Sequence, residues 1–299
     1  MKNKTVLFWL LFIFGSVFLF LFTFSFVLVL LGHDKLSLTS NGNIGVVEVK
    51  GVIMDPKIVL EQLETFAEDD NIKGIILRVD SPGGSVGPSQ EIYEQVLEVR
   101  KKKKVVASMV SVAASGGYYV ACSADKIVAN AGTLTGSIGV IMEMVNLEEL
   151  YRWAKLKPQT IKSGRYKDIG SSTRDMTPEE RKLLEDLLQD THERFKADIL
   201  RGRPNLTPEK LATIADGRVL SGSMAKELGL IDELGNLYAA VDLLVELTGL
   251  QDEPELVYPK EDEPSLFDLM VNGSVEDLAQ RLQGFRGRLT APLLLLMGE

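Results

Sequence analysis

Residues 74–110 read GIILRVDSPGGSVGPSQEIYEQVLEVRKKKKVVASMV, and this stretch decides the fold. It opens with a mostly apolar run of strand length, Gly74–Val79, in which Arg78 is the one charged residue. A proline- and glycine-containing turn follows. Helical spacing of apolar residues then extends from about Pro88 to Lys103, and a second apolar run covers Val105–Val110. A strand, a helix and a strand in immediate succession indicate two parallel strands joined by a helix.

The same alternation extends to both sides of this unit. The patterns predict strands at Ile44–Val49 and Lys126–Ala129, a helix at 55–69, a helix opening near Ala113, and a long helix to about Ile199. A capping-box pattern, Thr177–Glu180, marks the start of that long helix, with proline at its first position. We therefore expect an α/β protein with a mostly parallel sheet and flanking helices.

Composition excludes several function classes. The chain has 299 residues and a net charge of −9, which disfavours nucleic-acid binding. One cysteine, Cys122, and two histidines, His33 and His192, exclude a disulfide within the chain and most metal sites. The basic run Arg100–Lys104 is interpreted as a solvated helix end, where cations complement the helix dipole. We expect no cofactor, no metal and no nucleic-acid partner.

The N-terminus predicts a membrane anchor. Val6–Leu31 contains no charged residue, and as a helix it would be about 39 Å long, against about 30 Å for the hydrocarbon core of a bilayer. The run is longer than the apolar part of a cleavable signal peptide. Lys2 and Lys4 precede it, which favours a cytoplasmic N-terminus. We expect residues 1–33 to form a cytoplasmic stub and a single-pass anchor in the cytoplasmic membrane.

The rest of the chain divides into two further parts. Residues 34–250 carry the strand and helix patterns and are expected to form one domain on the extracytoplasmic side. The acidic, proline-containing segment 251–264 is interpreted as a linker, and the apolar pentad Leu293–Met297 lies near the C-terminus. Residues 251–299 are therefore expected to be a linker and an apolar tail. The pentad is far too short to span a bilayer.

Two glycine-containing turns carry the candidate chemistry. The first, Asp80–Ser85, links a strand to a helix, and its paired glycines let the backbone approach a ligand. The second holds Ser115 between Ala114 and Gly116 at an expected helix start, beside backbone amides. This layout suits a serine nucleophile with amides that stabilise an oxyanion. An ordinary strand-to-helix turn and a capped helix start are the alternative interpretations.

A serine nucleophile needs a general base, and the chain offers histidine or lysine. His192, with Asp168 or Asp175 as third member of a triad, lies within an amphipathic helix rather than on a loop. Lys162 and Lys167 share a polar, glycine-containing loop, where functional groups are often mounted. A free lysine is protonated at neutral pH, and burial lowers its pKa towards the range of a base. The residues alone do not choose between the two lysines.

Six segments between Ile44 and Thr248 resemble the signal peptide peptidase A family of membrane-anchored serine proteases, in its half-length form. They are DSPGG (80–84), AASGGYY (113–119), TLTGSIGVI (133–141), IKSGRYKD (161–168), MTPEE (176–180) and ADGRV (215–219). Their order and spacing are shared over most of the soluble chain. The resemblance implies the fold of the Clp protease proteolytic subunit and of the crotonase superfamily.

The resemblance also implies a Ser–Lys dyad, with Ser115 as nucleophile and Lys167 as general base; Ser163 is a candidate for orienting the lysine. Backbone amides of three glycines are implied to form the oxyanion hole: Gly83, Gly84 and Gly116. The expected substrates are apolar peptides such as cleaved signal peptides. The expected partners are the membrane, through residues 6–31, and further copies of the chain in a ring-like homo-oligomer. An acyl-CoA enzyme on the same fold and a catalytically idle membrane scaffold are the alternatives.

Overall fold

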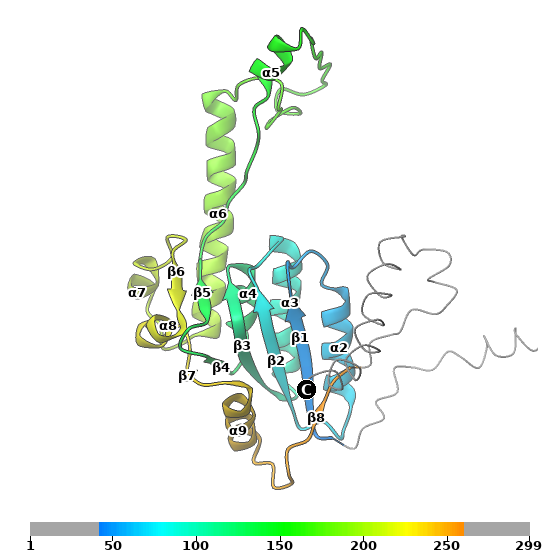
Figure 1. Ribbon diagram of the computed structural model, residues 1–299, viewed down its shortest axis with the longest axis vertical. Helices are drawn as coiled ribbons and strands as arrows, with labels where there is room; N and C mark the ends of the chain where they lie inside the picture. Colours follow the sequence, from blue (N-terminus) through cyan, green and yellow to red (C-terminus); the bar gives the residue numbers. More distant parts are fainter. Residues whose placement is uncertain (1–41, 260–299) are drawn as a thin grey trace, which may run out of the picture. The chain divides into compact units, whose positions relative to one another are not determined.

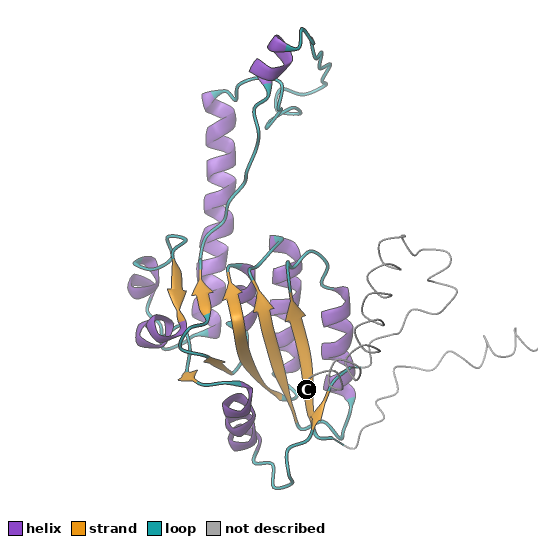
Figure 2. Ribbon diagram, in the orientation of Figure 1, coloured by secondary structure: helices purple, strands orange, loops and turns teal. Residues whose placement is uncertain are grey.

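The computed structural model describes residues 42–259, which form a sheet with helices on both faces (Figures 1 and 2). They belong to the first of two units, Met1–Pro259, and the second unit is Lys260–Glu299. The expected anchor, Val6–Leu31, and the apolar tail lie outside the described residues. None of the helices within 42–259 is long and apolar enough to cross a membrane.

The sheet runs in the order β6-β5-β3-β2-β1-β8, and β4 pairs with β3 and with β7. The strands are β1 (Ile44–Lys50), β2 (Gly74–Ser81), β3 (Lys104–Ala114), β4 (Lys126–Ala129), β5 (Leu134–Gly136), β6 (Val219–Ser221), β7 (Glu233–Leu234) and β8 (Leu256–Val257). Only β5 and β6 pair antiparallel among the described strands. The predicted mostly parallel α/β sheet is confirmed. β8 lies within the acidic segment interpreted as a linker.

Helices cover the two faces of the sheet unequally. The helices are α2 (Lys57–Glu68), α3 (Val86–Val99), α4 (Gly116–Ala121), α5 (Glu148–Trp153), α6 (Pro178–Gly202), α7 (Pro208–Ala212), α8 (Gly222–Leu228) and α9 (Leu237–Thr248). The larger core cluster joins α2, α3 and α4 to one face, and a smaller cluster joins α9 to the other. Within β2, Leu77 belongs to the first cluster and its neighbour Ile76 to the second. Burial on both faces explains why the first half of β2, Gly74–Leu77, is apolar without alternation.

The expected helix opening near Ala113 is wrong in its boundary. β3 continues to Ala114, because Ala113 and Ala114 lie in register with Thr135 and Gly136 of β5. These small side chains are buried, so the strand reaches the edge of the site before the chain turns into α4. The ladder with β5 is a long-range contact that the local pattern does not contain.

The basic run lies at the C-terminal end of α3, as expected, but several of its side chains are paired with protein groups rather than only solvated. Arg100 donates to the carbonyl of Ser123 at 2.7 Å, and Lys102 pairs with Glu68. α3 itself ends at Val99, four residues before the expected end at Lys103.

α6 begins at the expected capping box. The Glu180 amide donates to Thr177 Oγ1 at 3.2 Å, and the Thr177 amide donates to Glu180 Oε2 at 3.0 Å. Residues 145–177, here called the arm, include α5 and lie at the N-terminal end of α6, beyond the sheet (Figure 1). The two legs of the arm bond to each other, since the Leu147 amide donates to the Ser172 carbonyl at 2.7 Å.

Candidate active site

Ser115 stands between β3 and α4 in a strained backbone conformation. Its φ of 53° and ψ of −121° lie outside the ordinary regions for a residue with a side chain. Such a conformation costs about 1–3 kcal/mol and persists where the surroundings enforce it. Here the Ser115 amide donates to the Gly136 carbonyl at 2.9 Å, and its carbonyl accepts from the Tyr119 amide at 2.9 Å. The Ser115 hydroxyl makes no capping bond to α4.

The glycine turn between β2 and α3 lies directly against this serine. A β-carbon added to Gly83 would lie 2.6 Å from the Gly116 nitrogen, and one added to Gly116 would lie 3.2 Å from the Gly84 nitrogen. Ile53 holds the turn in place by donating to the Gly83 carbonyl at 2.9 Å and accepting from the Ser85 amide at 2.8 Å. The structure thus brings together the two turns that the sequence singled out.

The three glycine amides are not equally available. The Gly83 amide donates to Ser81 Oγ at 3.1 Å and is therefore engaged within its own turn. Within residues 42–259, the amides of Gly84 and Gly116 donate to no protein acceptor. These two N–H groups are the ones left to bind an oxyanion beside the serine hydroxyl.

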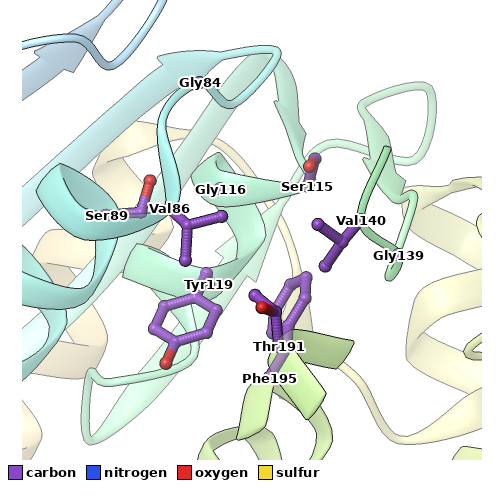
Figure 3. A pocket seen from close by; sticks show the side chains of 10 residues that line it. All are labelled: Gly84, Val86, Ser89, Ser115, Gly116, Tyr119, Gly139, Val140, Thr191 and Phe195. Carbon is purple, nitrogen blue, oxygen red and sulfur yellow. The ribbon is translucent and has the colours of Figure 1, made fainter. Parts of the chain in front are cut away.

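A mostly apolar pocket opens next to Ser115 (Figure 3). Its lining comes from the β2–α3 turn, α3, α4, the segment after β5 and the second half of α6: Gly84, Val86, Ser89, Ser115, Gly116, Tyr119, Gly139, Val140, Thr191 and Phe195. Apolar side chains dominate the walls, so the pocket suits an apolar group held beside the serine hydroxyl.

Tyr119 and its neighbours make the inner wall of this pocket rigid. The Tyr119 ring lies 4.6 Å from that of Phe195 and 5.1 Å from that of Tyr93, measured between ring centroids. The Tyr119 hydroxyl donates to the buried carboxylate of Asp198, to which Arg194 also donates at 2.7 Å. Burial, followed by the bond to Asp198, raises the pKa of Tyr119 well above its usual value, so the phenol stays neutral.

The close approach at Gly84 gives a direct test of the turn. A β-carbon there would lie 2.1 Å from the Ile53 carbonyl oxygen, whereas a β-carbon on Gly87 would meet nothing within 4 Å. We expect Gly84→Ala to lower the free energy of unfolding by about 2 kcal/mol, and Tm by about 4–8 °C. Gly87→Ala, the matched control in α3, should leave Tm unchanged or slightly raised. Equal Tm values for the two variants would contradict the described turn.

Lys167 does not lie beside Ser115 within the chain. It is exposed and sits on a turn of the arm, where its amide donates to the Gly164 carbonyl at 3.2 Å. α6 separates the two sites, because Thr191 lines the serine pocket while Pro178 begins the helix at the arm. Thirteen residues of helix correspond to about 20 Å. The structure therefore places Lys167 near the N-terminal end of α6 and Ser115 beside the second half of this helix.

The two lysines of the loop have different surroundings. Lys162 Nζ donates to the carboxylate of Asp168 and to the Arg165 carbonyl at 3.0 Å. Lys167 Nζ has no such partner within the described part of the chain. Ser163 is exposed on the same loop, and its hydroxyl contacts neither lysine there. Of the two, Lys167 has the ammonium group that is free to enter another site.

The alternative triad around His192 is not assembled in this chain. His192 is half-buried on α6 and lines a neighbouring cavity with Gly139 and Val140, not the serine pocket. The acids that such a triad needs are engaged at the arm: Asp168 pairs with Arg174, and Asp175 accepts from Asn146.

Sequence reasoning did not identify Thr191 and Phe195 as pocket residues. Both reach the site from α6, far along the chain from Ser115. The helical spacing of Phe195 indicates only that it is buried, because packing and substrate contact require the same apolar residues. Val140 and Tyr119 belong to the motifs TLTGSIGVI and AASGGYY, but the sequence assigns neither of them a role in the pocket.

Comparison with known proteins matches the chain to peptidase models. The model of peptidase family S49 matches residues 98–251, and the model of Clp protease matches residues 47–134, which include both glycine turns. A putative protease of Synechocystis is 44% identical over 71% of this chain and 77% of its own length. A putative protease of Methanocaldococcus jannaschii is 38% identical over 72% and 69%. A putative signal peptide peptidase of Enterococcus faecium is 34% identical over 73% and 67%.

Proposed function

The chain belongs to peptidase family S49, and we propose that this peptidase is a membrane-anchored serine endopeptidase with a Ser–Lys dyad formed between neighbouring chains. Ser115 is the nucleophile, Lys167 of a second copy is the general base, and the amides of Gly84 and Gly116 bind the oxyanion. The observation that carries the proposal is the geometry at Ser115: a strained serine beside two available amides and an apolar pocket.

The reaction follows the usual course of serine acyl transfer. Lys167 Nζ takes the proton of Ser115 Oγ as this oxygen attacks the peptide carbonyl, and the two amides stabilise the oxyanion. The same lysine gives the proton to the leaving amine as the C–N bond breaks. Water then attacks the acyl-enzyme and gives a proton to the lysine, which returns it to Ser115 Oγ as the acyl group leaves.

The position of Lys167 supports a base supplied by a second copy. A lysine base must be shielded from water, yet Lys167 is exposed on its own chain. A stretch of α6 about 20 Å long also separates the arm from the serine pocket. Docking of the arm against a neighbour would supply both the shielding and the approach. A closed ring repeats this head-to-tail contact for every chain.

The surface of the arm also suits a protein partner. Residues 150–167 contain six Lys or Arg and no Asp or Glu, in a chain whose net charge is −9. Large apolar side chains of the arm are open to solvent, with Trp153 82% and Leu156 59% exposed. A basic, partly apolar segment fits the acidic surface of another copy of this chain.

The pocket and the N-terminus support apolar peptides as substrates. The lining of Val86, Val140 and Phe195 favours an apolar side chain next to the bond that is cut. The charge-free run Val6–Leu31 would hold the site near the bilayer, on the extracytoplasmic side. Cleaved signal peptides combine both properties, and the Enterococcus relative bears the name of a signal peptide peptidase.

Covalent labelling tests this function. The full-length chain, treated with a fluorophosphonate, should carry one adduct that peptide mass spectrometry maps to Ser115. Ser111→Ala, which removes an exposed serine four residues earlier on β3, should label like the parent chain. An adduct at another serine, or none in chain that hydrolyses casein, would refute Ser115 as the nucleophile. An unlabelled chain without hydrolytic activity would favour the idle scaffold.

A further inference from the structure

We propose that Arg174 is the positioning residue for the catalytic base. Lys167 lies on a turn of the arm, and the Arg174 guanidinium attaches this turn to the first turn of α6. This inference rests on the proposed function above, in which Lys167 acts as the base. Arg174 itself contacts no reacting atom in the proposal. It acts through Asp168, the residue next to Lys167.

The Arg174 guanidinium binds both the side chain and the backbone carbonyl of Asp168. Its Nε donates to Asp168 Oδ2 at 3.0 Å, and one terminal nitrogen lies 2.9 Å from Asp168 Oδ1. The same nitrogen donates to the Asp168 carbonyl at 3.3 Å. Lys162 bonds to the same carboxylate, which is 13% exposed. The residue that follows Lys167 is therefore held at both its side chain and its main chain.

The other edge of the guanidinium holds α6. The two terminal nitrogens of Arg174 donate to the two Glu180 carboxylate oxygens at 2.6 and 2.8 Å. Glu180 is buried and also accepts from the Thr177 amide in the capping box. Because Glu180 belongs to the first turn of a 25-residue helix, the turn with Lys167 is attached to a rigid element.

Bidentate contacts to two carboxylates at once require a guanidinium rather than an ammonium group. The bond from Arg174, then that from Lys162, holds the pKa of Asp168 far below its usual range. Arg174, then the Thr177 amide, lowers the pKa of Glu180 to about 2. Both acids are therefore charged at neutral pH. The guanidinium can give two N–H groups to each carboxylate, whereas the ammonium group of a lysine has only three N–H groups in all.

A second ion pair also connects the loop with α6, but it is more exposed than the contacts of Arg174. Arg165 and Glu179 also pair across the same junction, but their side chains are 67% and 60% exposed. Exposed ion pairs contribute little to rigidity or stability. Arg174 is thus the main connection between the Lys167 turn and α6 among the described side chains, and Glu179→Gln is a matched control for its loss.

The test compares Arg174→Lys on one or the other of two chain types in a mixed assembly. Full-length Ser115→Ala chains, which supply the lysine, are mixed with Lys167→Ala chains, which supply the serine. Arg174→Lys on the lysine-supplying chain should lower kcat by about 10- to 100-fold, because small displacements of a catalytic group are costly. The same substitution on the serine-supplying chain should leave the rate within about twofold of the unsubstituted mixture. Glu179→Gln on the lysine-supplying chain should likewise have no effect.

The outcomes separate this inference from the proposed function. Equal losses on either chain, or a loss accompanied by lower Tm or altered assembly size, would show a general structural role and overturn the inference. No loss on the lysine-supplying chain would overturn it as well. An unsubstituted mixture without activity would refute the dyad between chains. In that case Arg174→Lys in the otherwise wild-type chain decides: a fall in kcat at unchanged KM and Tm supports positioning, and an unchanged kcat refutes it.

Discussion

Ser115→Ala is expected to lower the rate of casein hydrolysis by about 10⁴-fold or more, since removal of the proposed nucleophile leaves only binding and oxyanion stabilisation. The reason lies in the geometry of the site. The strained backbone holds the Ser115 hydroxyl at the mouth of the apolar pocket, beside the amides of Gly84 and Gly116. The pocket lining contains three other hydroxyl groups, and each already donates a hydrogen bond. Ser89 donates to the Ser85 carbonyl, Thr191 to the Leu187 carbonyl and Tyr119 to Asp198.

His192→Ala is the informative companion of this variant. His192 follows Thr191 on α6 but lines a separate cavity, and the acids of its hypothetical triad pair with other residues at the arm. We therefore expect the His192→Ala enzyme to keep most of its activity, within about threefold of the parent. Steady-state rates at one substrate concentration below KM suffice for the comparison. If both variants are equally inactive, histidine rather than lysine is the base.

The elements around the site could be predicted because each rests on a local pattern. The first half of β2 is buried on both faces, so Gly74–Leu77 appears in the sequence as an apolar run shortly before the Pro82–Gly84 turn. Thr177, Pro178 and Glu180 satisfy the first amides of α6 by themselves, so the start of that helix is also encoded locally.

The parts that could not be predicted depend on contacts between distant segments. The end of β3 at Ala114 is set by its ladder with β5. The position of the arm depends on bonds between its two legs and on the network of Arg174, Asp168 and Glu180. No periodicity in the sequence places Lys167 near the N-terminal end of α6 and Ser115 beside the second half of that helix. The same network separates the two lysines, because it engages Lys162 and leaves Lys167 without a partner within residues 42–259.

The separation of Ser115 and Lys167 leads to the second large effect. Each single variant, Ser115→Ala or Lys167→Ala, lacks one half of every dyad and should be inactive alone. In a head-to-tail ring, a site is complete when its serine comes from a Lys167→Ala chain and its lysine from a Ser115→Ala neighbour. Random equal mixing meets both conditions at about a quarter of the sites. Two inactive proteins should therefore give an active mixture.

The most direct measurement compares the casein hydrolysis rate of a mixture of full-length Ser115→Ala and Lys167→Ala chains with the rate of each variant alone. The two variants are co-expressed, or unfolded and refolded together, so that their chains mix within one assembly. The account predicts about a quarter of the wild-type rate per chain in the mixture and a background rate in each variant alone. Membranes that contain the Ser115→Ala variant alone, treated in the same way, serve as the blank. A mixture that assembles normally but stays as inactive as its two components would contradict a dyad formed between neighbouring chains.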